Sequence, residues 1–294
     1  MNSQLQLLEF QEYLKSCKKI IALVGAGLSV SSGLPTYRGT SSAGAPLWKN
    51  FNMIDLATPD SFYIDPGLVW QFYHYRRYKA LNASPNDGHY TLSKLSKLSN
   101  VNFLTITQNV DGLNLRSGHK KSKLIEIHGS LFGTKCTNFT CNFKENENFK
   151  MPMTEALDTP EDDDRVRAID EKDLPRCPVC QGLLRPDVLW FGESLSLNKM
   201  NKIDNFIEAK DGVDLILVIG TSGTVYPAIS YVDRVVLKGG KVAIFNTEIE
   251  DDILNGKRKN YWGFRGDAAE TLPTVLKPLL EENGVVKDDK KGAI

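Results

Sequence analysis

Five short apolar runs that alternate with stretches of helical spacing constrain the fold of this chain most strongly. Each run is rich in β-branched residues, is bounded by glycine or polar residues, and is too short to form a helix of its own. Runs buried on both faces and separated by helices are typical of a parallel sheet covered by helices. The sequence therefore predicts a doubly wound α/β fold. We expect strands at residues 20–24, 101–107, 124–127, 214–219 and 241–245, and helices at residues 5–14, 68–79, 89–98 and 229–237.

Two regions interrupt this alternation and predict a second, smaller domain. Residues 35–84 contain aromatic and turn residues and one expected helix, but no convincing strand. Between Glu155 and Asp173 the second region has nine acidic and three basic residues, which we interpret as a solvated loop. We therefore expect four parts: a sheet domain from residues 1–34, 85–130 and 185–285, a helical module at 35–84, a metal-binding module at 131–184 and a flexible tail at 286–294.

The composition excludes several classes of protein. The 294 residues include 36 Lys plus Arg and 36 Asp plus Glu, so no field of one sign favours nucleic acid or an anionic membrane. No apolar run approaches the roughly 20 residues needed to span a bilayer. Residues 1–14 contain no Arg and show neither a secretory signal nor a typical transit peptide. We expect a soluble intracellular protein of the cytoplasm or nucleus, with the mitochondrion as the alternative.

Four of the five cysteines form two close pairs, Cys136 with Cys141 and Cys177 with Cys180. Four thiolates in two such knuckles suit a closed tetrahedral Zn²⁺ site, which has no open position for water and is structural. Disulfide bonds or four unrelated core cysteines are the alternatives. The same pattern favours a reducing compartment. Cys17 is left over, and we assign it no role beyond a small core residue.

The expected strands end in residues that suit a nucleotide ligand. The first strand runs into Gly25 and Gly27, where backbone can approach a diphosphate, although Val30 occupies the place of the usual third glycine. Taken singly, each strand end is explained as well by an ordinary tight turn, whereas several together favour a ligand at the carboxyl edge of the sheet. The other small or polar strand ends are Gly220-Thr221-Ser222 and Asn246-Thr247-Glu248.

His128 is a candidate general base. It follows the expected strand at residues 124–127 and precedes Gly129, so backbone can approach its imidazole closely. The pKa of histidine lies near neutrality, which suits proton abstraction. A lone histidine is more often a satisfied structural group, but the neighbouring strand end at residues 107–112 supplies an amide and a carboxylate able to orient a ligand.

Taken in order along the chain, these motifs resemble those of the sirtuin family, the NAD-dependent protein-lysine deacylases. The resemblance covers nearly the whole chain and implies a Rossmann-like NAD-binding domain, with NAD⁺ and acyl-lysine meeting in a cleft beside the zinc-binding and helical modules. The matching segments are Gly25-Ala26-Gly27-Leu28-Ser29, Gly33-Leu34-Pro35-Thr36-Tyr37-Arg38-Gly39, Thr107-Gln108-Asn109-Val110-Asp111-Gly112, His128-Gly129, the two cysteine pairs, Trp190-Phe191-Gly192-Glu193, Gly220-Thr221-Ser222 and Asn246-Thr247-Glu248.

The resemblance also implies roles for individual residues. His128 would be the general base that lets a ribose hydroxyl attack the alkylimidate intermediate, and Asn109 and Asp111 would hold the ribose and the nicotinamide carboxamide. The products would be nicotinamide, free lysine and O-acyl-ADP-ribose. At Tyr37 many family members carry Phe. The remaining residues implied to bind NAD⁺ are Gly25, Ala26, Gly27, Ser29, Tyr37, Arg38, Gln108, Gly220, Thr221, Ser222, Asn246, Thr247, Glu248 and Ala268, and those implied to pair their backbone with the substrate peptide are Phe191, Gly192 and Glu193.

A finer resemblance concerns the acyl group. Tyr73 and Arg76 look like the pair that, in the class III branch, recognises the carboxylate of succinyl, malonyl or glutaryl lysine, and Ala57 matches the small residue that leaves room for the longer chain. Residues three apart share a helix face, and guanidinium and phenol groups both donate hydrogen bonds to a carboxylate. From spacing alone, a solvent-facing Tyr and Arg is the simpler interpretation. We expect weaker deacetylation as well.

The sequence is also compatible with three other kinds of protein. They are a protein-lysine deacetylase, a protein mono-ADP-ribosyltransferase that shares the NAD⁺ site, and a zinc module that binds a partner without catalysis. The expected partners are proteins that carry acyl-lysine, with no nucleic acid and no membrane, and the chain is expected to be a monomer.

Overall fold

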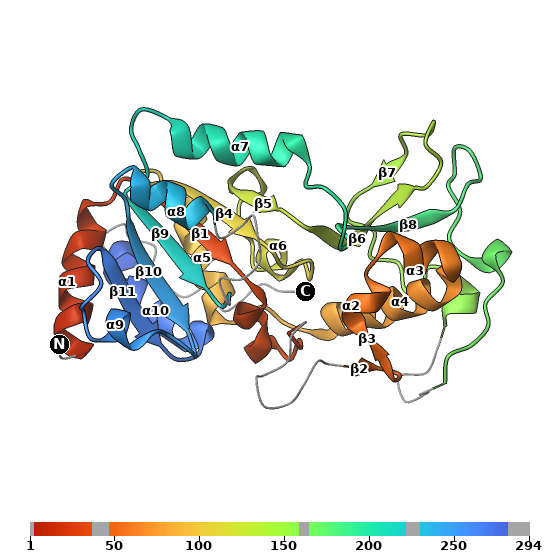
Figure 1. Cartoon of the computed structure of the whole chain (residues 1–294), viewed down its shortest axis with the longest axis horizontal. Coiled ribbons are helices and arrows are strands. Elements are labelled where there is room, and N and C mark those ends of the chain that lie inside the picture. Colours follow the sequence, from red (N-terminus) through yellow and green to blue (C-terminus); the bar gives the residue numbers. More distant parts are fainter. Residues whose placement is uncertain (1–2, 37–46, 159–164, 222–229, 282–294) are drawn as a thin grey trace.

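The computed structural model describes residues 3–36, 47–158, 165–221 and 230–281 (Figure 1). Among these residues, six strands form one parallel sheet in the order β11-β10-β9-β1-β4-β5. This is the Rossmann order, and it reverses between β1 and β9, where ligands of such sheets bind. The predicted doubly wound fold is confirmed. The strands are β1 (Lys19–Val24), β4 (Asn102–Thr107), β5 (Leu124–Glu126), β9 (Leu215–Ile219), β10 (Lys241–Asn246) and β11 (Tyr261–Arg265).

Helices cover both faces of this sheet. Alternate side chains of β1 point to opposite faces, so Ile20 and Val24 join one apolar core while Ile21 and Leu23 join another. On the first face lie α1 (Ser3–Ser16), α5 (Asp87–Lys97) and α10 (Ala268–Glu281), and on the second lie α7 (Leu197–Glu208) and α8 (Ser230–Leu237). No helix of the described residues is both long and apolar enough to cross a membrane.

A smaller sheet and a second group of helices lie at the other end of the molecule from α1 (Figure 1). Here β6 (Gly129–Cys136) pairs antiparallel with β7 (Lys144–Glu145) and β8 (Leu184–Val188). The helices are α2 (Met53–Leu56), α3 (Pro59–Ile64) and α4 (Pro66–Asn82), beside the short hairpin of β2 (Leu47–Trp48) and β3 (Phe51–Asn52). They share a separate core in which large aromatic side chains gather.

The start of α4 is set by its local sequence. The Asp65 side chain accepts a hydrogen bond of 2.8 Å from the Leu68 amide, and Pro66 occupies the first helical position, where no amide hydrogen is needed. The remaining short elements are α6 (Leu113–Arg116), α9 (Asp251–Leu254) and 3₁₀ turns at Ala26–Ser32, Lys121–Lys123, Glu155–Leu157 and Glu171–Asp173.

The structure adds elements that the sequence patterns did not predict. α7, α10 and β11 were not expected, and β2 and β3 lie in a region where no strand was expected. α10 contains Pro273 and Pro278, which normally argue against a helix, but burial of apolar residues along one side offsets this. Gly263 interrupts the strand pattern of β11 because a side chain there would crowd Ile253 of α9.

Candidate functional site

The carboxyl ends of β1 and β9 contact each other through glycine backbone. The Gly25 amide donates to the Ile219 carbonyl at 2.8 Å, and the Gly27 amide donates to the Gly220 carbonyl at 2.8 Å. A Cβ on Gly27 would lie 2.6 Å from the Gly220 Cα, and Gly220 has φ +56°. Glycine is therefore required at this contact, which lies at the switch point of the sheet.

A buried polar network adjoins the end of β1. The Asn109 side-chain amide donates to the Gly25 carbonyl at 3.0 Å and to the Ser29 hydroxyl at 3.2 Å. The Ser29 hydroxyl donates to Asp111 at 2.7 Å, and the other Asp111 oxygen accepts from the Leu113 amide at 2.9 Å. Four of the predicted NAD⁺-binding residues, Gly25, Ser29, Asn109 and Asp111, thus form one hydrogen-bonded cluster.

His128 lies beside this network, just beyond β5. Its Nδ1 is 3.1 Å from the Gln108 carbonyl, which can only accept, so Nδ1 carries the proton and Nε2 has the lone pair. Burial lowers the pKa of His128 from its usual 6.5, the hydrogen bond to Gln108 opposes this, and the Lys199 ammonium lowers it further. The imidazole is therefore neutral at physiological pH and suited to accept a proton.

The buried Tyr73 and the half-buried Arg76 lie together on α4, next to the Ser29–Asn109–Asp111 network. Burial raises the pKa of the Tyr73 hydroxyl well above its usual range, so Tyr73 stays a protonated phenol. The Arg76 guanidinium carbon lies 5.8 Å from the centre of the Tyr73 ring. Burial lowers the pKa of Arg76 to about 10, and the nearby Asp111 carboxylate opposes this shift. Arg76 therefore keeps its charge at neutral pH.

The loop after β8 brings further predicted residues to the same place. The Phe191 amide donates to the Ala57 carbonyl at 2.9 Å, and the Glu193 amide donates to the Trp190 carbonyl at 3.0 Å. The Glu193 carboxylate accepts two hydrogen bonds from Arg185, of 2.5 and 2.9 Å. The Gly192 backbone is exposed and has φ +88°. The side chain of Glu193 is thus part of an ion pair within the chain.

The four paired cysteines gather at one point. All four sulfur atoms lie within 4.8 Å of one another, and each close contact joins the two knuckles, 3.5 Å between Cys136 and Cys180 and 3.7 Å between Cys141 and Cys177. These separations exceed the roughly 2.05 Å of a disulfide. They match the roughly 3.8 Å expected between sulfurs bound to one tetrahedral Zn²⁺ at about 2.3 Å. The cysteines fit one structural zinc ion.

The other predicted NAD⁺-binding residues lie at the ends of β9 and β10, at the start of α10 or outside the described residues. The Asn246 side chain donates to the Thr221 carbonyl at 3.1 Å, which joins the ends of β10 and β9. Thr247 and Glu248 are exposed beyond β10, and Ala268 is buried at the start of α10. Tyr37, Arg38 and Ser222 lie outside the described residues.

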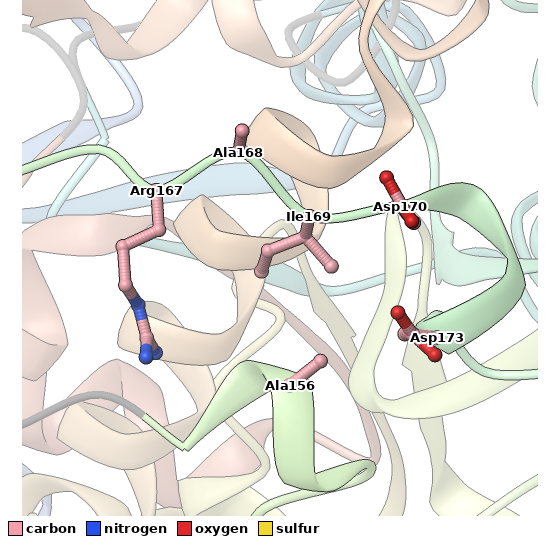
Figure 2. Close-up of a pocket in the computed structure, with 6 residues that line it drawn as sticks. All are labelled: Ala156, Arg167, Ala168, Ile169, Asp170 and Asp173. Atoms are coloured by element: carbon pink, nitrogen blue, oxygen red, sulfur yellow. The ribbon is translucent and has the colours of Figure 1, made fainter.

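A hollow of about 350 Å³ lies apart from the predicted site residues. Figure 2 shows Arg167 on one side of it and Asp170 and Asp173 on the other. The Arg167 guanidinium donates to the Asp158 carbonyl at 2.7 Å, and the Arg167 backbone is bonded to Gln71 of α4. None of the predicted site residues lines this hollow, so it is not the candidate site.

Sequence reasoning did not single out the side chains of Arg185, Trp190 and Lys199. The Trp190 indole N–H donates to the Tyr73 hydroxyl at 2.8 Å, and the Lys199 ammonium donates to the Glu126 carbonyl at 2.5 Å. Trp190 belongs to a segment that was noted for its backbone, whereas Lys199 lies on a helix that was not expected. No local pattern marks either contact, because each joins residues far apart in the chain.

The sheet order, the glycine contact at its switch point and the tetracysteine centre define an α/β protein of the Rossmann type with a zinc module. Residues 25–227 match the profile described as the Sir2 family, whose members are called sirtuins. The chain belongs to this family.

Relatives and solved structures agree with this assignment. A Candida albicans NAD-dependent protein deacylase is 62% identical, covering 95% of this chain and 99% of the relative. The dog NAD-dependent protein deacylase sirtuin-5, described as mitochondrial, is 38% identical, covering 92% of this chain and 84% of the relative. A crystal structure of a Sir2 homologue in complex with NAD has a TM-score of 0.74 and 31% identity, and the match covers 94% of each chain.

Proposed function

We propose that this chain is an NAD⁺-dependent protein-lysine deacylase that prefers acyl groups ending in a carboxylate, such as succinyl, malonyl and glutaryl, over acetyl. The observation that carries the preference for a carboxylate is the buried Tyr73 with the half-buried Arg76 beside the Ser29–Asn109–Asp111 network. A protonated phenol and a guanidinium together form a donor set for a carboxylate. An acetyl group has no carboxylate that could accept a hydrogen bond from either donor.

The residues at the strand ends fit the proposed co-substrate. When bound, NAD⁺ supplies the ribose carbon that receives the acyl oxygen as nicotinamide leaves. The glycine contact at Gly25, Gly27 and Gly220 presents backbone without side chains at the switch point. The buried Asn109 and Asp111 supply an amide and a carboxylate next to it, suited to the nicotinamide carboxamide and the ribose.

His128 is proposed as the general base. Its Nδ1–H is held by the Gln108 carbonyl, so Nε2 is the atom that would accept a proton from a ribose hydroxyl. Removal of this proton by His128 would let the hydroxyl oxygen add to the carbon of the acyl group. The lowered pKa of His128 keeps Nε2 ready to accept at neutral pH.

The loop at residues 191–193 is proposed to bind the substrate peptide as an added strand. The amides of Phe191 and Glu193 already donate within the chain, to Ala57 and Trp190. Backbone pairing with a peptide would therefore use the carbonyl groups of this loop and the exposed Gly192.

The experiment compares nicotinamide release with succinyl-lysine and acetyl-lysine peptides for the natural chain and for Arg76→Met. Loss of a charged hydrogen-bond donor is expected to lower kcat/KM for the succinyl peptide about 10- to 100-fold and leave that for the acetyl peptide within about threefold. Mass spectrometry should find ADP-ribose on the released acyl group and none on protein. An unchanged succinyl preference in Arg76→Met would contradict the acyl pocket.

The matched control is Arg77→Met. The Arg77 guanidinium donates to the carbonyls of Leu131, Asn148 and Lys150 at 2.5, 2.7 and 3.1 Å, so its role is structural. Arg77→Met should lower stability and leave the ratio of succinyl to acetyl activity unchanged.

The cytoplasm or nucleus is proposed as the compartment, and a monomer as the oligomeric state. The clustered thiols suit a reducing environment. Fluorescence microscopy of the tagged chain and light scattering of the purified protein test these two proposals.

A further inference from the structure

Trp190 contacts several neighbours within the core that the smaller sheet shares with α2, α3 and α4, and it is 2% exposed. The Arg185 guanidinium carbon lies 3.3 Å from the centre of its ring. The Glu193 carboxylate accepts from the Trp190 amide at 2.8 Å and binds Arg185 at the same time. The indole edge points at Tyr73, whose hydroxyl oxygen accepts from Nε1 at 2.8 Å.

That hydrogen bond determines what the Tyr73 hydroxyl can do. An indole N–H can only donate, so the Tyr73 oxygen must accept from it, and the hydroxyl hydrogen must point elsewhere. Tyr73 is completely buried, so no bulk water competes for that hydrogen. Arg76, three residues further along the same helix, lies next to the same ring. The hydroxyl of Tyr73 is thus left as a hydrogen-bond donor beside a guanidinium.

We propose that Trp190 is a positioning residue for acyl specificity: its indole N–H orients the Tyr73 hydroxyl so that its proton is donated to the terminal carboxylate of the acyl group. Arg185 and Glu193 hold the indole in the plane that makes this donation possible. The inference rests on the proposed function, because it concerns the same acyl pocket. It adds a residue whose effect on specificity passes through Tyr73 and not through direct contact with the carboxylate.

Phenylalanine in place of Trp190 would keep the packing of the ring and remove the hydrogen bond to Tyr73. A phenyl ring could still stack on Arg185 and pack against Phe62, which lies 5.2 Å from the indole ring centre. It could not donate to Tyr73, whose oxygen would lose its partner and whose hydroxyl could rotate. An acetyl group has no carboxylate to receive the proton, so its removal should not depend on this rotation.

The test measures kcat/KM for succinyl and acetyl peptides in Trp190→Phe. We expect the ratio of succinyl to acetyl activity to fall about 5- to 10-fold, the size of one net hydrogen bond, with acetyl activity within about twofold of the natural chain. Trp70→Phe is the matched control. Trp70 is equally buried in the same core, but its indole donates to the Leu184 carbonyl at 2.9 Å. This variant should lose stability and keep the ratio.

A double variant shows whether Trp190 acts through Tyr73. In the Tyr73→Phe background, Trp190→Phe should cause no further fall in the ratio, whereas two independent effects would multiply. A full 5- to 10-fold fall in that background, or an unchanged ratio in Trp190→Phe alone, overturns the inference. If Tyr73→Phe and Arg76→Met also leave the ratio unchanged, the proposed acyl preference itself fails, which is a separate result.

Discussion

Adjacent arginines on α4 have opposite surroundings, and only one of them faces the candidate site. Arg77 is 1% exposed and donates to carbonyl groups of the segments at residues 131 and 148–150. Arg76 lies near Tyr73 and Asp111. The sequence alone could not separate their roles, because a helix turns about 100° per residue and the direction of each face depends on what packs there.

Replacing Arg77 should therefore destabilise the chain. Arg77→Met leaves the buried Leu131 carbonyl and two part-buried carbonyls without this donor, which costs about 2–4 kcal/mol of the free energy of unfolding. Chemical denaturation followed by circular dichroism measures this loss. An unfolding free energy within about 0.5 kcal/mol of the natural value would contradict the structural role.

The state of His128 predicts an acid limit to the activity. Because burial lowers its pKa from 6.5, the neutral base persists below pH 6.5 and is lost only as the pH falls through the lowered value. The kcat for the succinyl peptide should stay constant from about pH 8 to 6.5 and then decline. His128→Asn should abolish turnover. Retained activity in this variant would exclude His128 as the base.

Among the elements, the strands and helices with clear periodicity were predictable, and those defined by tertiary contacts were not. β1, with every residue buried, is recognisable from its apolar run. α10 is not, because Pro273 and Pro278 oppose the helical pattern that its buried side supplies. The strand-end glycines were predictable as a turn, but their direct contact across β1 and β9 depends on the strand order.

The small sheet contains a like-charge pair that one carboxylate compensates. Lys135 of β6 lies opposite Lys144 of β7, an unfavourable pairing, and Asp187 of β8 lies 3.8 and 2.6 Å from their ammonium groups. Asp187→Asn should lower the free energy of unfolding by about 1–2 kcal/mol, measured by urea denaturation. Glu147→Gln, which removes an exposed partner of Lys121, is the control and should cost less. Equal losses would contradict this role for Asp187.

The whole molecule combines a Rossmann sheet with a module whose four cysteines fit one zinc ion. Removal of the metal should affect the stability of the sheet and of the cysteine module to different extents. The cysteines lie beside the core that contains Tyr73 and Trp190. A zinc chelator should therefore lower the thermal midpoint and abolish deacylation, and added Zn²⁺ should restore both. Full activity in protein shown by metal analysis to lack zinc would contradict a structural metal.

Buried neutral histidines predict acid sensitivity of the fold. Burial lowers the pKa of His74 and His119 to about 4 from the usual 6.5. Between these values the two histidines bind more protons in the unfolded chain than in the folded chain, so their contribution to stability falls as the pH drops from 6.5 towards 4. Thermal melts at pH 7.5, 6 and 5 should show a declining midpoint, with a shallower decline in His119→Gln. A midpoint independent of pH would contradict this.

The most direct test of the central claim is the ratio of kcat/KM values for a succinyl-lysine and an acetyl-lysine peptide of the same sequence, measured by nicotinamide release. Hydrogen bonds from Tyr73 and Arg76 to the terminal carboxylate predict a ratio of at least about 10 in favour of succinyl. A ratio at or below one would contradict an acyl pocket built for a carboxylate.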